Sequence, residues 1–274
     1  MAAEPALPVL PPGLPYLLAA LGDNGVEMHA LAAVVQRFPT IAGRLLALAN
    51  SAWASPARPV TGLAEACTLL GLRVVRSVSI ALSVARPFDP NRCTGFDAVR
   101  FWTSAFLTAE AAALLSPHLD RTCDADTLRT AGLLHNLGLL WLADARSQQT
   151  GLALQAVAAE ADLSLSVALR ERVGTDYHEA GGLLGAAWQL PEALTVAMRH
   201  CADADYRGPH WRLAAGCGLA VSIAAAPLRD SDRLPGETAV SAWPIPSAAM
   251  ERLYLQTAKK RESLHQLAQA LFGG

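Results

Sequence analysis

The sequence carries little charge for its length. Its 274 residues include 22 lysines and arginines against 24 aspartates and glutamates, a formal net charge of −2, and the pI is near 6.4. Without a basic excess the chain has little means of neutralising a phosphate backbone, so we expect no nucleic-acid partner. Hydrophobic residues make up 52% of the sequence, which is typical of a well-buried helical protein and unlike a disordered chain.

Cysteines are few, odd in number and never spaced as Cys-x-x-Cys. The five are Cys67, Cys93, Cys123, Cys201 and Cys217. This pattern argues against a disulfide framework or a zinc ribbon and predicts reduced thiols in the cytoplasm. The start of the chain lacks the basic segment of a signal peptide. No apolar run reaches membrane-spanning length without a charge, glycine or proline, so we expect no membrane insertion.

Alternating strand patterns of useful length are also missing. Apolar residues instead recur at helical spacing, which predicts an all-α fold. Composition marks a proline-rich lead-in and a candidate subdomain boundary at the proline- and glycine-containing break, and the family resemblance described below supports two helical subdomains with a C-terminal helical extension. The predicted segments are 1–13, 14–88, 96–205 and 206–274, with a break from Pro87 to Gly95 between the subdomains.

Helix boundaries follow from caps and prolines. Pro39 is predicted to begin a helix at its first turn, Thr61 and either Asp124 or Asp126 to cap helices, and Gly174 to end one. The predicted helices are Leu14–Leu21, Glu27–Arg37, Thr40–Asn50, Thr61 to near Gly71, Leu72–Ala85, Phe96–Leu115, a helix around His135, Leu152–Ala161, Leu165–Val173, Thr175–Trp188, a helix from Pro191 through His200, Trp211–Ala225 and Ser247–Phe272, with a loop at Pro227–Pro246.

The most informative stretch runs from Thr130 to Trp141. It places His135 and Asn136 in the middle of an apolar segment whose spacing predicts one continuous helix. An imidazole on the buried face needs a partner, because an unpaired buried polar group costs about 1–3 kcal/mol. Taken alone, His135 is best interpreted as a core histidine hydrogen-bonded to a backbone carbonyl or a carboxylate.

Two later histidines on predicted helices weaken that interpretation. They are His178 and His200, the second followed directly by Cys201. Three imidazoles from three helices, with the Cys201 thiol, have the nitrogen and sulfur ligands of a vestigial metal site. We favour the alternative, a hydrogen-bonded polar cluster, and predict no metal. If a metal binds, its ligands are His135, His178 and His200.

Candidate interface residues lie in the first helical subdomain. Asn50 and Ser51 follow a predicted helix, and Trp53 stands in a loop rich in serine and proline. Each has a structural alternative. The polar pair would cap the helix C-terminus, and the indole would be a packing anchor, which we favour in both cases.

Several stretches, in this order along the chain, resemble the HDOD domain family. They are Leu14-Pro15, Leu45–Ala52, Thr61–Gly71, Phe101-Trp102, Ala131–Gly138, and Gly174–Pro191 with its His178, Gly182 and Trp188. The resemblance covers roughly Pro8 to Asp203. It implies an N-terminal helical bundle packed on a degenerate bundle similar to the HD-superfamily metallophosphohydrolases, which include the HD-GYP phosphodiesterases of cyclic di-nucleotides. HDOD domains are regarded as signalling or output domains that have lost the catalytic residues.

The sequence departs from those enzymes at the positions that the resemblance identifies. The enzymes carry a His-Asp doublet, whose aspartate helps to hold a cation and to lower the pKa of bound water. Here the doublet is His135-Asn136, and no histidine occurs between Phe96 and Leu115, where the enzymes place an earlier ligand. The implied vestigial pocket comprises His135, Asn136, His178, His200 and Cys201. The resemblance thus implies no catalytic residue and no cofactor.

Three functions are compatible with these residues. We favour a non-catalytic signalling module that acts through protein–protein contacts. Its implied partners are regulatory proteins of a bacterial signalling pathway, including pathways that use cyclic di-nucleotides. The first alternative is a sensor that binds a nucleotide or other small molecule in the vestigial pocket. The second is a weak metal-dependent phosphodiesterase, which an aspartate at position 136 would favour and an asparagine disfavours.

Overall fold

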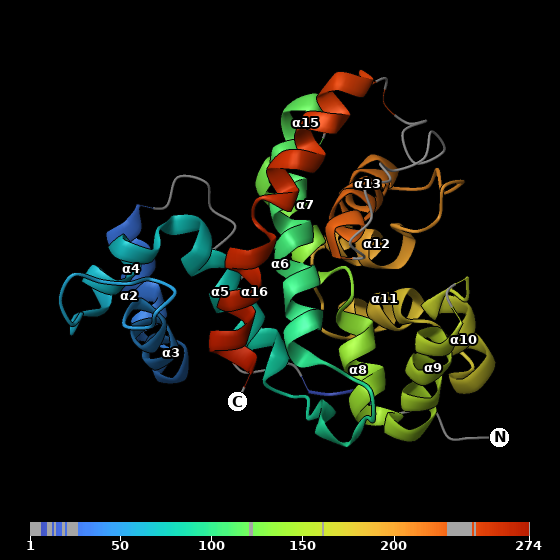
Figure 1. Cartoon of the computed structure of the whole chain (residues 1–274), viewed down its shortest axis with the longest axis horizontal. Helices are drawn as coiled ribbons and strands as arrows, with labels where there is room; N and C mark the ends of the chain where they lie inside the picture. Colours follow the sequence, from blue (N-terminus) through green and yellow to red (C-terminus); the bar gives the residue numbers. More distant parts are fainter. Residues whose placement is uncertain are drawn as a thin grey trace. The chain divides into compact units, whose positions relative to one another are not determined.

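The structure, a computed structural model, describes residues 7–9, 13, 15–17, 20, 27–120, 123–160, 162–228, 243 and 245–273. These residues form helices and no strand, which confirms the predicted all-α fold (Figure 1). The elements are α2 (Met28–Gln36), α3 (Pro39–Ala49), α4 (Leu63–Leu70), α5 (Leu72–Ala85), the 3-10 turn η1 (Pro90–Arg92), α6 (Ala98–Leu115), η2 (Ser116–His118), α7 (Ala125–Leu134), α8 (Leu137–Ala145), α9 (Ser147–Ala159), α10 (Leu165–Val173), α11 (Tyr177–Ala187), α12 (Glu192–His200), α13 (Trp211–Leu228), α15 (Ser247–Ala258) and α16 (Arg261–Phe272). The predicted lead-in 1–13, helix Leu14–Leu21 and loop Pro227–Pro246 lie largely outside the described residues.

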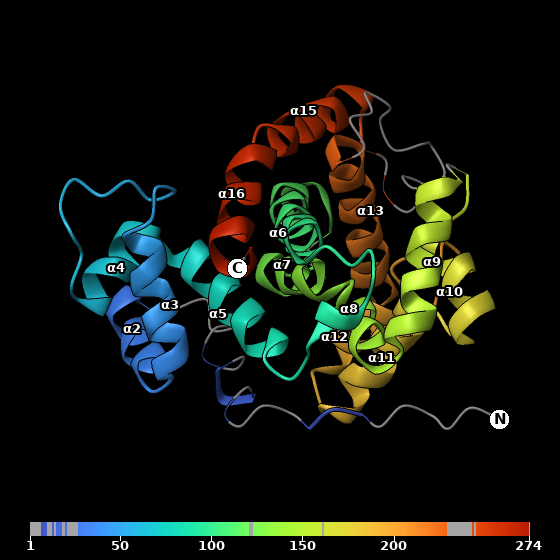
Figure 2. The ribbon, with the colours of Figure 1, turned by 60° about the horizontal axis from the view of Figure 1, so that its bottom comes forward.

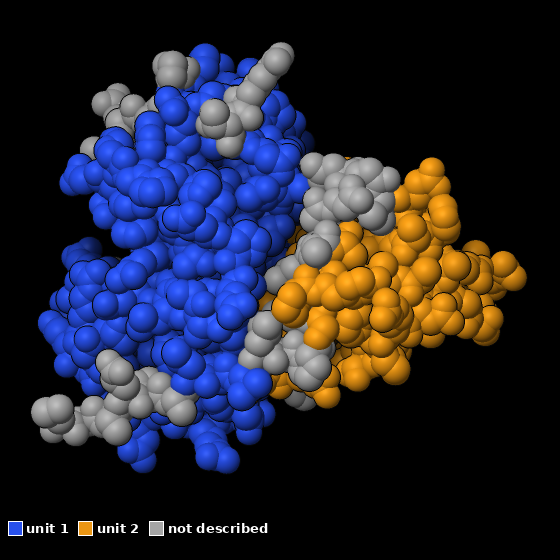
Figure 3. Space-filling model, turned by 180° about the vertical axis from the view of Figure 1, so that it is seen from behind, with its two compact units in different colours: residues 1–9, 88–261 blue, residues 10–87, 262–274 orange. Residues whose placement is uncertain are grey.

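The chain divides into two compact units (Figure 3). Unit 1 comprises residues 1–9 and 88–261, and unit 2 comprises residues 10–87 and 262–274. The division after Pro87 falls at the start of the predicted break. The predicted C-terminal extension forms no unit of its own, because α13 and α15 pack against α6 inside unit 1 while the chain from Glu262 onward belongs to unit 2.

Helix α6 lies at the centre of unit 1. It packs against α7, α13 and α15, and Figure 2 shows it nearly end-on with α7 and α13 beside it. Phe101, Trp102 and Phe106 are among its buried side chains. Gly132 of α7 allows the two helices to approach closely, since a Cβ at this position would stand 3.0 Å from the carbonyl oxygen of Thr108 on α6.

Helix α8 packs on α11 with backbone against backbone. A Cβ on Gly138 of α8 would overlap the carbonyl oxygen of Tyr177 and the backbone nitrogen of Gly181. Only a glycine fits at this distance, because every other residue carries a Cβ. Helix α11 packs in turn on α12, and α12 on α13. This series of contacts brings several of the predicted site residues together.

Unit 2 contains α2, α3, α4 and α5, which pack on one another. Gly71 joins α4 to α5 with a φ of +79°, a conformation that favours glycine. Among the described residues no single helix is long and apolar enough to cross a membrane. Only α4 and α5 counted together, across a bend of 110°, meet the limits of length and composition.

The predicted continuous helix around His135 is wrong. Helix α7 ends at Leu134 and α8 begins at Leu137, so His135 and Asn136 form the turn between two helices. The backbone of Asn136 leaves the helical region, with φ −105° and ψ 8°. Residues on both sides of the turn are buried, and apolar spacing alone does not distinguish one bent segment from one straight helix.

Several other predicted boundaries also differ from the structure, among them the start of α9, which is Ser147 and not Leu152. The final helix, predicted as one, breaks at Lys259-Lys260, where the N–H of Lys260 bonds the carbonyl oxygen of Thr257 in a tighter turn. Gly62, not Thr61, stands at the N-cap of α4, with no side-chain hydrogen bond. The predicted starts at Pro39 and Asp124 and the end at Gly174 are confirmed, since Gly174 adopts the left-handed conformation with φ +88°.

Candidate functional site

The turn between α7 and α8 holds the first two predicted site residues. His135 is 4% exposed, and its Nδ1 lies 2.7 Å from the carbonyl oxygen of Gly132. Asn136 donates from Nδ2 to the carbonyl oxygen of Phe101 on α6, at 3.4 Å. The Oδ1 of Asn136 is buried and has no hydrogen-bond partner among the described residues. The doublet is therefore held by backbone carbonyls of its own helix and of α6.

Asp176 positions the second histidine from the start of α11. Its Oδ1 accepts hydrogen bonds from the backbone N–H groups of His178 at 2.8 Å and Glu179 at 2.9 Å. The carboxylate is 2% exposed and forms an ion pair with Arg170. A negative charge at a helix N-terminus is also favoured by the helix dipole. The cap fixes the first turn of α11 and with it the direction of the His178 side chain.

The ring of His178 contacts Cys201, which follows the last residue of α12. The Cys201 Sγ lies 3.4 Å from the His178 Nδ1, and the ring also has a backbone hydrogen bond to Met198. Tyr177 packs against the ring, with centroids 4.0 Å apart. A thiol from α13, Cys217, hydrogen-bonds Cys201. Three helices thus contribute to one buried cluster of an imidazole and two thiols.

Burial and hydrogen bonding shift the pKa values in this cluster in opposite directions. The hydrogen bond from Cys217, aided by His178, holds the pKa of Cys201 well below its ordinary value against the opposing effect of burial. That same hydrogen bond, together with burial, raises the pKa of Cys217. Burial lowers the pKa of His178, but Cys201 and Asp176 outweigh it and raise the value. Burial is the main reason that the pKa of His135 is lowered. These directions stabilise the charged forms of Cys201 and His178 and the neutral form of His135.

His200 does not join this cluster by hydrogen bonding. Its ring stacks on Tyr206 with centroids 3.8 Å apart and planes within 11°. Its Nδ1 lies 3.7 Å from the carboxylate of Asp203, and the histidine side chain is 27% exposed. His178 and Cys201 are in direct contact, and both are close enough to His135 to influence its pKa, while His200 has a different set of neighbours.

The residues do not fit the metal centre of HD-type hydrolases. Within the part of the chain that the structure describes, no three histidine, cysteine, aspartate or glutamate side chains are arranged to hold a metal ion. The His178 ring is engaged by Cys201 and the Met198 backbone. Asn136 brings no charge to offset the desolvation of a cation.

Sequence reasoning missed two members of this site. Asp176 was not among the predicted site residues, although an aspartate before an apolar run is a usual N-cap signal. Cys217 stood within a helix of small apolar residues, and no spacing in the sequence links it to Cys201. Glu179, the next residue after His178, accepts a hydrogen bond from Thr175 at 2.9 Å.

A family model for the HDOD domain matches residues 7–204. The chain belongs to the HDOD domain family. The resemblance predicted from ordered motifs is thereby confirmed, and its limits agree closely with the matched residues. No protein among the curated sequences matches this HDOD chain.

Solved structures share the fold. A candidate signal transduction protein from Marinobacter aquaeolei is 20% identical in sequence to this chain, with a TM-score of 0.84. The match covers 97% of this chain and 60% of the Marinobacter chain. The HDOD chain thus spans 60% of the length of that relative. An HDOD domain protein of unknown function from Geobacter sulfurreducens is 18% identical with a TM-score of 0.70, covering 97% and 94%. The MmoQ response regulator from Methylococcus capsulatus is 27% identical with a TM-score of 0.52, covering 93% and 99%.

In this HDOD chain the candidate interface residues make internal contacts. Asn50 donates to the carbonyl oxygen of Val60 at 2.8 Å and accepts from its N–H at 2.8 Å. Ser51 donates to the carbonyl oxygen of Leu48 at 2.7 Å. Trp53 donates its indole N–H to the carbonyl oxygen of Ser263 on α16, at 2.8 Å. These contacts favour the structural interpretation of all three side chains.

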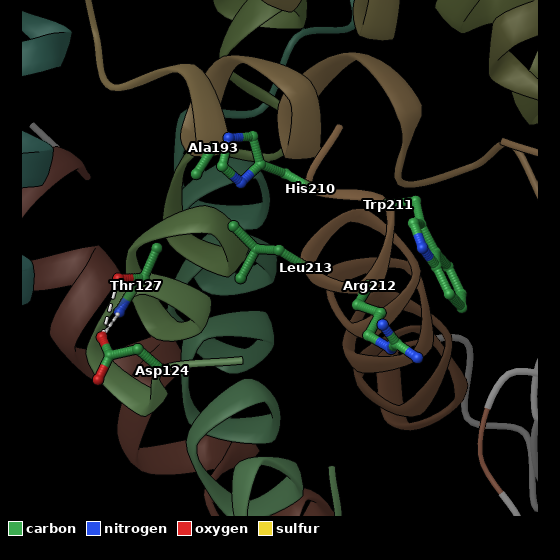
Figure 4. Close-up of a pocket in the computed structure, with 7 residues that line it drawn as sticks. All are labelled: Asp124, Thr127, Ala193, His210, Trp211, Arg212 and Leu213. Carbon is green, nitrogen blue, oxygen red and sulfur yellow. Dashed lines mark hydrogen bonds between the residues drawn. The ribbon is translucent and has the colours of Figure 1, made fainter. Parts of the chain in front are cut away.

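A surface pocket of about 410 Å³ lies elsewhere in unit 1 (Figure 4). It is lined by Asp124, Thr127, Ala193, His210, Trp211, Arg212 and Leu213. None of the predicted site residues is among them. Arg212 pairs with Asp120 at 2.7 Å, and His210 lies 3.7 Å from Glu192. These pairs balance the charges around the opening, so the pocket offers little net attraction to an anion.

Proposed function

We propose that this HDOD chain is a non-catalytic signal-transduction module that acts through contacts with regulatory proteins of a bacterial pathway. The family supports a signalling role, and so does the description of the Methylococcus relative as a response regulator. The five free, buried cysteines suit a reducing cytoplasm. Pathways that use cyclic di-nucleotides are the natural place to look for partners, given the relationship of the fold to their phosphodiesterases.

One observation carries the non-catalytic part of the proposal. The rings of His135 and His178 use their nitrogens in hydrogen bonds within the protein, and no three candidate ligands among the described residues face a common point. His178 contacts Cys201 and Met198, and Asn136 donates to Phe101. Water activation by a metal needs an open coordination position beside fixed ligands. The interactions of these residues leave them as a buried polar scaffold.

The first experiment is an assay of cyclic di-nucleotide hydrolysis by the purified chain with Mn²⁺, Fe²⁺ or Mg²⁺. Wild type and Asn136→Asp are compared, with Asn136→Ala as the matched control. We expect no turnover above buffer for any of the three proteins. Turnover by the wild type would refute the proposal. Turnover by Asn136→Asp alone would show that the scaffold lacks only the charge of that one carboxylate.

The protein-contact part is tested in a strain that lacks the gene. A double variant, His135→Gln with Asn136→Ala, removes the pocket chemistry, and its fold is checked by circular dichroism. We expect it to restore the wild-type phenotype, because a scaffold does not need those side chains to react. If the double variant folds but does not restore the phenotype, the proposal is contradicted, because the pocket side chains would then be needed for function.

A second function, small-molecule sensing, has one observation in its favour. The buried Oδ1 of Asn136 has no partner among the described residues, and an unpaired buried acceptor costs about 1–3 kcal/mol. A ligand with an N–H or O–H donor would offset that cost. Thermal unfolding with cyclic di-nucleotides tests this function. A ligand at 100 times its Kd stabilises the folded state by about 2.7 kcal/mol, and Asn136→Ala should abolish the shift. No shift with the wild type would remove this alternative.

A further inference from the structure

Two buried cysteines lie where the end of α12 packs against α13. Cys201 follows the last residue of α12, and Cys217 lies within α13. Hydrogen bonding between the two side chains is the largest cause of the opposite pKa shifts of the two thiols, so Cys201 and Cys217 are neighbours. Both cysteines are free in this structure.

The backbones of the two segments approach closely beside the pair. A Cβ on Gly218, the neighbour of Cys217, would overlap the carbonyl oxygen of Cys201 and stand 3.7 Å from its Cα. Disulfides usually join residues whose Cα atoms are about 4.4–6.8 Å apart. The close backbone approach beside two neighbouring thiols makes this pair a candidate for such a bond.

We propose that Cys201 and Cys217 form a site of reversible oxidation, in which a hydroperoxide converts the two thiols into an intramolecular disulfide between α12 and α13. Nothing in the signalling role described above requires this chemistry, so the two proposals stand or fall separately.

The order of reaction follows from exposure and from the neighbours of each sulfur. Cys201 keeps 7% of its surface exposed, while Cys217 keeps none. His178 lies 3.4 Å from the Cys201 sulfur and favours its thiolate, which is the reactive form. Cys201 is therefore the residue that meets the oxidant first, and Cys217 is the resolving thiol.

The reaction balances with hydrogen peroxide as the oxidant. The Cys201 thiolate attacks one peroxide oxygen, the O–O bond breaks, and the released hydroxide takes a proton to become water. The product at Cys201 is a sulfenic acid. The Cys217 sulfur then attacks the Cys201 sulfur, the S–O bond breaks, and the leaving hydroxide takes the Cys217 proton to give a second water. Two thiols and one peroxide yield one disulfide and two waters.

Oxidation would also change the surroundings of His178. In the reduced protein the Cys201 sulfur is a hydrogen-bonding partner of the His178 Nδ1. A disulfide sulfur carries no charge and no proton, so this partner is lost when the bond forms. Oxidation of the pair therefore changes the hydrogen bonding of the His178 ring.

The test is peptide mapping of the full-length protein after treatment with hydrogen peroxide, with free thiols alkylated under denaturing conditions. Arg207 and Arg212 lie between the two cysteines, so trypsin separates them unless a disulfide joins the peptides. We expect a linked pair of peptides carrying Cys201 and Cys217, a mass loss of about 2 Da before alkylation, and reversal by dithiothreitol. The number of alkylated cysteines should fall from five by two.

Matched variants separate the pair from other thiols. Cys93→Ser removes a buried cysteine outside the pair and should leave the linked peptides unchanged. Cys217→Ser should abolish the link and leave a sulfenic acid at Cys201 that a dimedone probe captures. The wild-type map decides the question even if a variant does not fold. A sulfinic acid on Cys201 without the link, a link that involves another cysteine, or all five thiols intact while methionines oxidise would overturn the proposal.

Discussion

Replacing Gly138 by alanine should destabilise unit 1, although alanine is the better helix former. The added methyl would overlap the carbonyl oxygen of Tyr177 and the backbone nitrogen of Gly181, and would stand 3.0 Å from the carbonyl carbon of Ala180. All three atoms belong to the backbone of α11, so no side chain can rotate away. The two helices must separate instead.

The magnitude follows from two opposing effects. Overpacking a rigid contact costs about 3 kcal/mol, at the upper end of the usual range. Alanine in place of glycine within a helix returns about 1 kcal/mol. We therefore expect Gly138→Ala to lower the free energy of unfolding by about 2 kcal/mol, which corresponds to a fall in Tm of about 4–8 °C for a domain of this size.

Gly181→Ala on the facing helix is the matched control. The nearest atoms to its added methyl are the Cβ and Cε of Met198 at 3.6 Å and the backbone nitrogen of Gly138 at 3.7 Å, which are ordinary contacts. This variant should be unchanged or more stable by up to about 1 kcal/mol. Urea unfolding followed by far-UV circular dichroism measures both proteins. If Gly138→Ala is as stable as Gly181→Ala, the close packing of α8 on α11 is wrong.

Three further predictions concern single side chains. Burial lowers the pKa of His135 in the folded protein. Below about pH 6.5 the unfolded state therefore binds a proton at this ring that the folded state does not bind. As the pH falls, the free energy of unfolding should decrease by up to about 1.4 kcal/mol per pH unit. His135→Gln should lose that part of the acid sensitivity in urea titrations at several pH values, and an unchanged slope would contradict the assignment. Asp176→Ala should cost about 2 kcal/mol, because two backbone N–H groups and Arg170 lose their partner; a loss within error of zero would show that the cap matters little. Asn50→Ala should cost about 1–3 kcal/mol by leaving both backbone groups of Val60 unpaired, and a smaller loss than in Ser51→Ala would argue against that bridge.

Local signals in the sequence predicted most of the helices. The helices Leu72–Ala85 and Leu165–Val173 coincide with α5 and α10, because caps, prolines and apolar spacing all point to the same boundaries there. The break at His135-Asn136 was not predictable in this way. It depends on contacts with α6 and α11, which lie far away in the sequence, and a buried turn keeps the apolar pattern of a buried helix.

Three members of the site, at the ends of α7 and α12 and on α11, were predictable from the sequence, but their arrangement was not. Family motifs singled out His135, His178 and Cys201, which the structure brings together. They also grouped His200 with them, although its ring stacks on Tyr206. The direction of a side chain at a helix end depends on where the last turn ends. A shift of one residue along the helix rotates the side chain by about 100° around the helix axis. Cys217 was missed because its partner lies on another helix.

The measurement that tests the central claim most directly is the metal content of the untagged protein, purified without chelator and analysed by mass spectrometry of the elements. We expect well below one ion per chain in the wild type, and no difference between the wild type and His135→Gln or His178→Gln. About one bound ion per chain, lost in both variants, would show that these histidines are metal ligands after all and would contradict the proposal of a non-catalytic scaffold.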